Sequence, residues 1–178
     1  DYYFVRGRLV TKKAISDTTS QDVLGNSNIS HSETSYSYRI SDGTDYTGQD
    51  IPVGMYLVFK EITTTSWSKG EDIYGGTWTG EKTPLIIKQV YDAEPTKIKL
   101  NDKLRDVYLY KYIIQGIEKE LFKVDSDHNL SFLTHEINGI ITESTGTDIF
   151  GNLTNTTTTT DYYFVRGRLV TKKAISDT

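Results

Sequence analysis

The stretch DYYFVRGRLVTKKAISDT, Asp1–Thr18, returns without a single change at Asp161–Thr178. Two separated copies that are identical indicate that the second copy is either a designed graft of the first or the start of a following tandem repeat. Aromatic and β-branched residues make up much of the stretch, which predicts a β-strand. Its two faces are expected to be an apolar one with Tyr3, Val5 and Leu9 and a basic one with Arg6 and Arg8. A lone strand cannot satisfy its own backbone N–H and C=O groups, so we expect it to join a sheet with an open edge.

The duplication predicts a strand that completes the sheet of another copy. In this it resembles the donor-strand-exchange subunits of pili and other filaments. The resemblance implies a structural protein of the cell surface, extracellular and fimbria-like, whose partners are copies of itself in a head-to-tail filament. The polymerisation strand would use Tyr3, Val5, Leu9 and Val10 to fill pockets of a neighbour, and Tyr163, Val165, Leu169 and Val170 to do so within the chain. A second interpretation is a tandem-repeat module of a surface adhesin that binds a host-surface protein or a carbohydrate.

The repeat also divides the chain into segments. Residues 1–18 form the terminal, donor-type strand, residues 19–153 the body, residues 154–160 a Thr-rich tether, and residues 161–178 the duplicate. The run of Thr residues in the tether favours extended backbone, because β-branched side chains are restricted about χ1. We therefore expect the tether to carry the duplicate away from the last strand of the body.

Within the body, short runs of apolar or alternating residues are separated by turn residues, which predicts an all-β fold. Many short strands with regular turn signals favour a Greek-key β-sandwich, immunoglobulin-like or prealbumin-like, that the added strand completes. The expected strands are residues 36–40, 51–61, 85–91, 96–100, 107–114, 120–124 and 130–141, with one helical turn at 101–106.

One local pattern bears on the type of sandwich. The run Ile51-Pro52-Val53-Gly54-Met55-Tyr56-Leu57-Val58 resembles the turn and strand of prealbumin-like and Cna-B-like β-sandwich modules, and Val5-Arg6-Gly7-Arg8-Leu9 is similar to their opening motif. The glutamate that such modules place beside an isopeptide bond would fall near Glu61, with the spacing one residue off. No matching Lys and Asn pair accompanies it, so the isopeptide chemistry is not carried over.

Composition narrows the possible functions. The chain has no cysteine, which excludes a disulfide framework and any thiolate metal site. Its formal net charge is −4, with net positive terminal copies and a net negative segment between them, a balance that argues against nucleic-acid binding. No window is long and apolar enough to span a membrane, so no membrane insertion is expected.

The best candidate for metal chemistry is the stretch from Asp125 to Glu136, whose oxygen ligands would be Asp125, Asp127, Asn129 and Glu136. Their spacing is that of a calcium-binding EF-hand loop, but Leu130 stands where that loop needs Gly. The same residues also predict a β-hairpin with Asp125–Asn129 as its loop and Asn129 at positive φ. No nucleophile, phosphate-binding or zinc motif is present, so we expect neither catalysis nor a cofactor.

Two further features suggest contact surfaces. Trp67, Tyr74 and Trp78 surround a Gly-rich loop and are candidates for a ligand loop that stacks on sugar rings or a partner protein, although aromatic residues in such a place also anchor loops. A second pattern, Asp followed by two apolar residues and Gly, recurs at 22–25, 72–75 and 148–151. It predicts three similar tight turns at one end of the sandwich.

Overall fold

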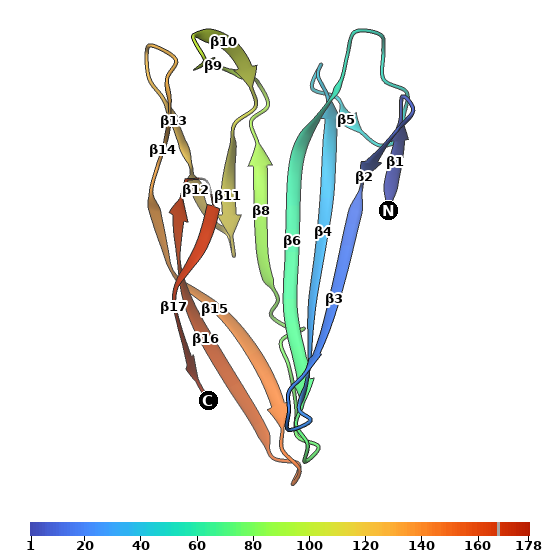
Figure 1. Cartoon of the computed structure of the whole chain (residues 1–178), viewed down its shortest axis with the longest axis vertical. Helices are drawn as coiled ribbons and strands as arrows, with labels where there is room; N and C mark the ends of the chain where they lie inside the picture. Colours follow the sequence, from blue (N-terminus) through green and yellow to red (C-terminus); the bar gives the residue numbers. More distant parts are fainter. Residues whose placement is uncertain (167) are drawn as a thin grey trace.

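The computed structural model describes residues 1–166 and 168–178, and its regular elements are all β-strands (Figure 1). In chain order the strands are β1 (Tyr2–Val5), β2 (Arg8–Thr11), β3 (Lys13–Gln21), β4 (Ser27–Ile40), β5 (Asp45–Tyr46), β6 (Leu57–Glu71), β7 (Thr77–Thr79), β8 (Leu85–Tyr91), β9 (Thr96–Leu100), β10 (Lys103–Val107), β11 (Tyr110–Ile114), β12 (Ile117–Glu120), β13 (Phe122–Val124), β14 (Leu130–Phe132), β15 (His135–Thr147), β16 (Leu153–Val165) and β17 (Arg168–Asp177).

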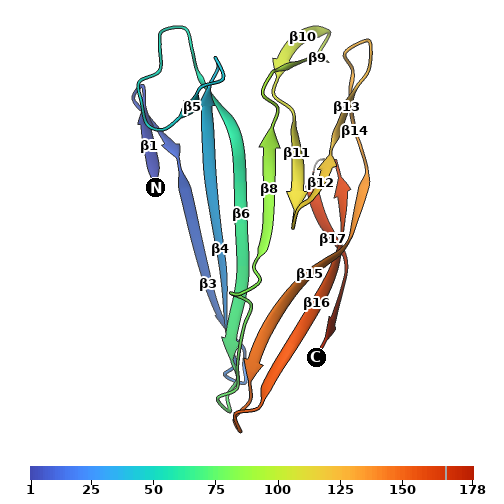
Figure 2. The ribbon, with the colours of Figure 1, turned by 180° about the vertical axis from the view of Figure 1, so that it is seen from behind.

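Most of these strands form one antiparallel sheet that turns back on itself at the short strand β7. One limb contains β3, β4, β6, β8, β11 and β12 in that order, and the other contains β15, β16 and β17. Strand β7 joins the limbs because it pairs with the end of β6 on one side and the end of β15 on the other. The limbs therefore form a V with its closed end at the bottom, as both views show (Figures 1 and 2).

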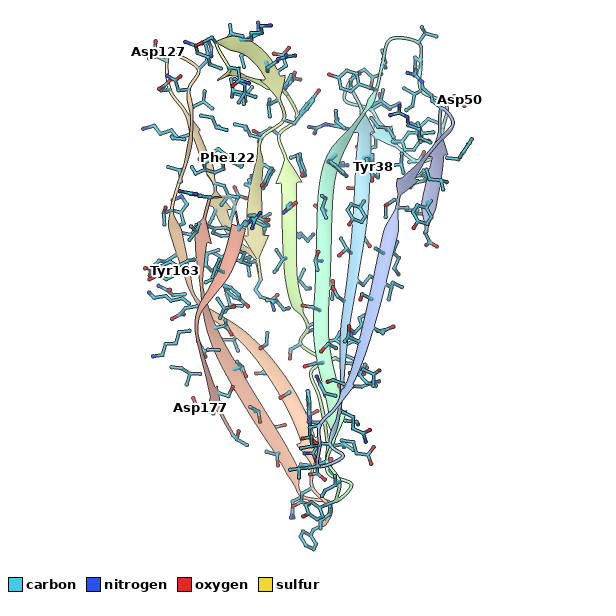
Figure 3. The ribbon with its side chains drawn as sticks, in the orientation of Figure 1. Tyr38, Asp50, Phe122, Asp127, Tyr163 and Asp177 are labelled. Carbon is cyan, nitrogen blue, oxygen red and sulfur yellow. The ribbon has the colours of Figure 1, made fainter. Side chains whose placement is uncertain are left out.

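The structure has two hydrophobic clusters, of which one joins the two limbs and the other lies on the first limb alone. The limb core lies where β15 and β16 face β8 and β11, and it consists of Tyr112, Ile114, Leu121, Ile137, Ile140, Tyr162 and Phe164. The hairpin core lies under β1 and β2 on the first limb, and its buried members are Tyr38, Ile40 and Tyr46. In Figure 3 the labels Phe122 and Tyr38 mark the two regions on opposite sides of the molecule.

The all-β sandwich that the sequence predicts is confirmed, while the connections are more local than expected. Successive long strands of each limb are neighbours in space, so the order is an antiparallel meander and not the predicted Greek-key order. Short turns join β3 to β4, β11 to β12 and β15 to β16, since a tight loop returns the chain to the adjacent strand position. The longer connections between other neighbouring strands contain the short strands β5, β7, β9 and β10. Strands β8 and β9 have the predicted bounds, and the end of β4 contains the predicted strand 36–40, whereas β3 and the first part of β4 are rich in Ser, Thr and Asn and are not among the strands predicted for the body.

Two smaller expectations are wrong. Residues 101–106 form no helical turn: Asn101 and Asp102 have φ of 49° and 59° and make the two-residue turn between β9 and β10. Residues 154–160 are not a free tether, because they form the first half of β16 and pair with β15. The extended backbone favoured by the Thr run is present, but it is part of the sheet.

Among the described residues, no helix is long and apolar enough to cross a membrane.

Candidate functional site

The repeated sequence folds into the same β-hairpin at both ends of the chain. In the first copy Tyr2 pairs with Thr11 and Val5 with Arg8, and in the second copy the pairs are Tyr162 with Thr171 and Val165 with Arg168. In the first copy Arg6 and Gly7 have φ of 48° and 78°, as a two-residue type I′ turn requires. The predicted single strand is therefore two short strands, and the Arg-Gly pair between apolar runs is the sequence signal for the turn.

The turn decides which side chains share a face. Residues that pair across a hairpin project from the same side, so Tyr2, Phe4 and Leu9 lie on one face and Tyr3, Val5 and Val10 on the other. We call these the Phe face and the Tyr3 face, and use the same names for the equivalent residues of the second copy. Both faces carry apolar side chains suited to packing, and Arg8, which pairs with Val5, lies at the turn end of the Tyr3 face.

The second copy buries its Phe face. Phe164 is 0% exposed and Tyr162 is 9% exposed, and Leu169 packs against the same limb core. The Phe164 ring stacks on Tyr112 with centroids 4.9 Å apart. Burial raises the pKa of Tyr162, so its phenol stays neutral within the core.

The first copy buries its other face. Tyr3, Val5 and Val10 pack against the hairpin core, where Tyr3 meets the edge of Tyr46 at a centroid distance of 5.1 Å. The Tyr38 hydroxyl donates a hydrogen bond to the Thr11 carbonyl at 2.6 Å, and burial raises the pKa of Tyr38 to about 12. Arg6 donates from Nη2 to the carbonyls of Ile51 and Pro52 at 3.1 and 2.6 Å.

Each copy leaves exposed the face that the other copy buries. In the first copy Tyr2, Phe4 and Leu9 are 64%, 73% and 68% exposed. In the second copy Val165 and Val170 are about half exposed, and Figure 3 shows Tyr163 on the outer side of its limb. The same sequence thus forms a hairpin with two faces that can pack. Each copy buries one of these faces against its own chain and leaves the other face largely exposed.

This arrangement corrects the polymerisation set. Of the residues expected to fill pockets within the chain, only Leu169 packs into the limb core, while Tyr163, Val165 and Val170 lie on the opposite face. In the first copy Tyr3, Val5 and Val10 pack against their own chain and Leu9 is exposed. The residues missed are Tyr162 and Phe164, because a continuous strand would have put Leu9 beside Tyr3, whereas the turn places it opposite Phe4.

The strand edges differ between the copies in the same way. In the second copy the first strand of the hairpin is the end of β16, which pairs with β15 through Tyr162–Ile137 and Phe164–His135. On its other side it pairs with β17. Across the described residues, β1 pairs with β2 alone and β3 with β4 alone. The first copy therefore has free backbone groups on the side where the second copy has neighbours.

A polar contact adds to the docking of the second copy. Lys172 donates from Nζ to Glu136 Oε2 at 2.9 Å and lies 4.7 Å from the centroid of the Tyr163 ring. The hydrogen bonds from Lys172 and then from Tyr163 lower the pKa of Glu136. Glu136, a candidate calcium ligand, is thus part of an ion pair between β15 and the duplicated segment.

The other calcium candidates are placed in a hairpin loop. Strands β13 and β14 pair as the hairpin interpretation predicts, and Figure 3 shows Asp127 at the far end of their loop. Asp125 Oδ1 accepts hydrogen bonds from the amides of Asp127 and Asn129 at 2.9 and 2.8 Å, so the carboxylate caps the loop. The positive φ lies at His128, 65°, and not at Asn129. Among the described residues no group of three or more His, Asp or Glu side chains is arranged to hold a metal ion.

The same loop design recurs at the closed end of the V. Asp22, Asp72 and Asp148 each accept two backbone amides of their own loop through Oδ1, at 2.8–3.0 Å. These hydrogen bonds hold the shape of each loop without the help of packed side chains. The two apolar residues that follow each Asp can therefore project into solvent. The exposed tip residues are Val23, Leu24, Ile73, Tyr74, Ile149 and Phe150.

The three aromatic candidates do not form one stacking surface, although Trp67 and Trp78 both border one cleft. Trp67 pairs across the sheet with His31 and stacks on its ring at 4.6 Å. Trp78 lies against Gly70, where a Cβ would come within 2.7 Å of its ring. Residues 67 and 70 project from opposite faces of β6 because side chains alternate along a strand. Tyr74 lies apart from both, at a loop tip.

Trp78 borders a cleft of about 580 Å³ between the two limbs. Hydroxyl side chains from five strands line it, among them Ser16, Ser30, Ser66, Thr142 and Thr158. The lining is mixed, because Leu85 and Tyr162, which belong to or pack against the limb core, also border the cleft. Such a set of hydroxyls beside an indole offers hydrogen bonds and a stacking surface to a polar ligand.

Comparison with protein-family models finds no matching family, and comparisons with curated proteins and with solved structures also find no match.

Proposed function

We propose that this chain is a structural unit of an extracellular, fimbria-like filament, and that the opening residues of a following copy complete the core of each unit. The observation that carries the proposal is the position of Tyr162 and Phe164. These residues repeat the start of the chain, and they are buried among residues of the body such as Ile114 and Ile137.

The energy of this contact is large compared with the stability of a domain. A fully buried large apolar side chain contributes about 1.5–3 kcal/mol, and the net stability of a domain is about 5–15 kcal/mol. Loss of Tyr162, Phe164 and Leu169 together would remove a large share of that total. Self-association through such a segment is non-covalent and needs no cofactor.

A chain that ends at Thr160 tests the proposal. It lacks the duplicate, so it is expected to melt at a much lower temperature than the full chain or to aggregate through its open core. A synthetic peptide of residues 161–178 should restore the melting temperature, and a peptide of the same composition in scrambled order should not. Equal melting temperatures for the truncated and full chains would refute the proposal.

A second candidate function rests on a different observation, the hydroxyl-lined cleft beside Trp78. In this alternative the chain is a tandem-repeat adhesin module that binds a carbohydrate. A glycan array with Trp78→Ala tests it, and Tyr74→Ala is the control because Tyr74 lies at an exposed loop tip, outside the residues that line the cleft. Binding that Trp78→Ala removes and Tyr74→Ala retains would support the adhesin, and no binding to any glycan would count against it.

A further inference from the structure

We propose that the hairpin of residues 2–11 is a two-faced joint between copies: its Tyr3 face packs on its own unit while its Phe face docks into the limb core of a preceding copy. This inference rests on the proposed function and specifies its interface. The partner is a second copy of this chain, either the preceding unit of a tandem array or a separate molecule.

The occupant follows from the duplication itself. Tyr162, Phe164 and Leu169 occupy the limb core of this chain. Tyr2, Phe4 and Leu9 are the equivalent residues of the first copy and have the same cross-strand pairs, yet they are largely exposed. The limb core binds the Phe face of the second copy within this chain. The exposed Phe face of the first copy is identical, so the surface that fits it is the limb core of another molecule.

The two docking modes are compatible in one hairpin because they use opposite faces. The Tyr3 face of the first copy rests on Tyr38 and Tyr46. The Phe face of the second copy rests on Tyr112 and Ile114. A hairpin with both neighbours would have both faces covered, and none of the contacts described for either copy would have to break.

The backbone edges agree with this geometry. The first strand of the second copy pairs with His135–Ile137 of β15 on the edge that faces away from β17. In the part of the chain that the structure describes, the equivalent edge of β1 pairs with no strand. Residues 174–177 pair with Thr157–Thr160 of β16, and the equivalent residues of β3 pair with β4 on their opposite edge. A strand has two edges, so β3 can pair with β16 of a preceding copy and with its own β4 at the same time. The joint would therefore fuse the sheets of successive units into one.

Four full-length chains test the joint: wild type, Phe4→Asp, Phe164→Asp and the double variant. In wild type and Phe4→Asp the limb core is filled by the chain's own second copy, so both are expected to be monomeric by analytical ultracentrifugation. Phe164→Asp empties the limb core and keeps an intact Phe face at residue 4, so its mass should rise with concentration. The double variant should lose that association, because neither copy then offers an intact Phe face.

Backbone exchange gives a second readout. In assembled Phe164→Asp, the amides of Tyr2 and Phe4 should exchange more slowly than in the wild-type monomer, since β1 gains β15 of a neighbour as a partner. If Phe164→Asp is unfolded at low concentration, the folded fraction of this variant should rise with protein concentration. The folded fraction of the double variant should stay low. A folded fraction that never rises would overturn the joint.

The outcomes separate this inference from the proposed function. If Phe164→Asp is destabilised and rescued by the 161–178 peptide, yet never associates with other chains, the proposed function stands and the joint is refuted. If Phe164→Asp melts like wild type and stays monomeric, both are refuted. If the double variant associates as strongly as Phe164→Asp, the molecules meet through another surface, and the joint is refuted.

Discussion

Residues 2–11 and 162–171 have the same sequence and the same hairpin geometry, but they bury opposite faces. The first copy packs through Tyr3 on the hairpin core, and the second through Phe164 on the limb core. Local sequence therefore determines the hairpin, while the neighbouring surface determines which face is inside. A hairpin with a polar face would not allow this choice, because one orientation would bury unpaired polar groups.

The largest difference in stability between the two copies is expected when the equivalent phenylalanine is truncated in each copy. Phe164→Ala is expected to cost about 3–5 kcal/mol, the range for a fully buried aromatic residue. Phe4→Ala should change the free energy of unfolding by less than about 0.5 kcal/mol, as is usual at an exposed position. Urea denaturation of the two variants at equal protein concentration measures both, and equal losses would contradict the difference between the copies.

The reverse asymmetry is expected at Tyr3 and Tyr163. Tyr3→Ala removes edge-on contacts with Tyr38 and Tyr46 and should cost about 1–2 kcal/mol, since each aromatic pair contributes about 0.5–1.5 kcal/mol beyond its buried area. Tyr163→Ala loses the contact with Lys172, a cation–π interaction of about 0.5–1 kcal/mol, and the hydrogen bond to the exposed Glu136. Thermal melts in which Tyr163→Ala is the more damaging change would show that the assignment of faces is reversed.

A narrower test concerns the hydrogen bond that holds the first copy on its core. Tyr38→Phe keeps the ring but removes the donor to the Thr11 carbonyl, and the expected loss is about 1 kcal/mol. Hydrogen exchange should speed up in β1 and β2 and remain unchanged in β16 and β17. A uniform change in both copies would mean that Tyr38 acts on global stability and not on this contact.

The smallest expected effect is a response to acid at the second copy. The folded pKa of Glu136 is lowered from its usual value of 4.5, chiefly by the hydrogen bond from Lys172. The stabilisation from this group is therefore complete above about pH 4.5 and is lost as the pH falls through the lower folded pKa. Melting temperatures of wild type and Glu136→Gln between neutral and acidic pH should show a smaller acid-induced loss in the variant. Parallel curves would rule out the contribution of this pair.

The sequence predicts the β-class and several strands well, since β8 and β9 have strong β-branched or alternating patterns. It does not predict β3 and the first part of β4, whose Ser, Thr and Asn residues resemble a loop. These strands are held by pairing along their whole length and by contacts such as the 3.1 Å hydrogen bond between Thr34 and Thr64, which no hydrophobic pattern reveals.

For the candidate site, the sequence shows that the duplicated segment matters but not how it packs. The assignment of Leu9 to the same face as Tyr3 assumed a continuous strand. Arg6 takes a positive φ that is uncommon for a non-glycine residue, so the turn is recognisable mainly from Gly7. Which face each copy buries depends on surfaces far away in the sequence, and residue patterns within the repeat cannot determine it.

The continuity of β16 has a mechanical consequence. This strand runs without a break from Leu153 in the body to Val165 in the duplicated segment, with β15 on one side and β17 on the other. Tension applied along it would load the hydrogen bonds of both ladders in shear, so that many would have to fail together. A row of units joined in this way would resist stretching as a continuous ribbon, and not as beads on a flexible string.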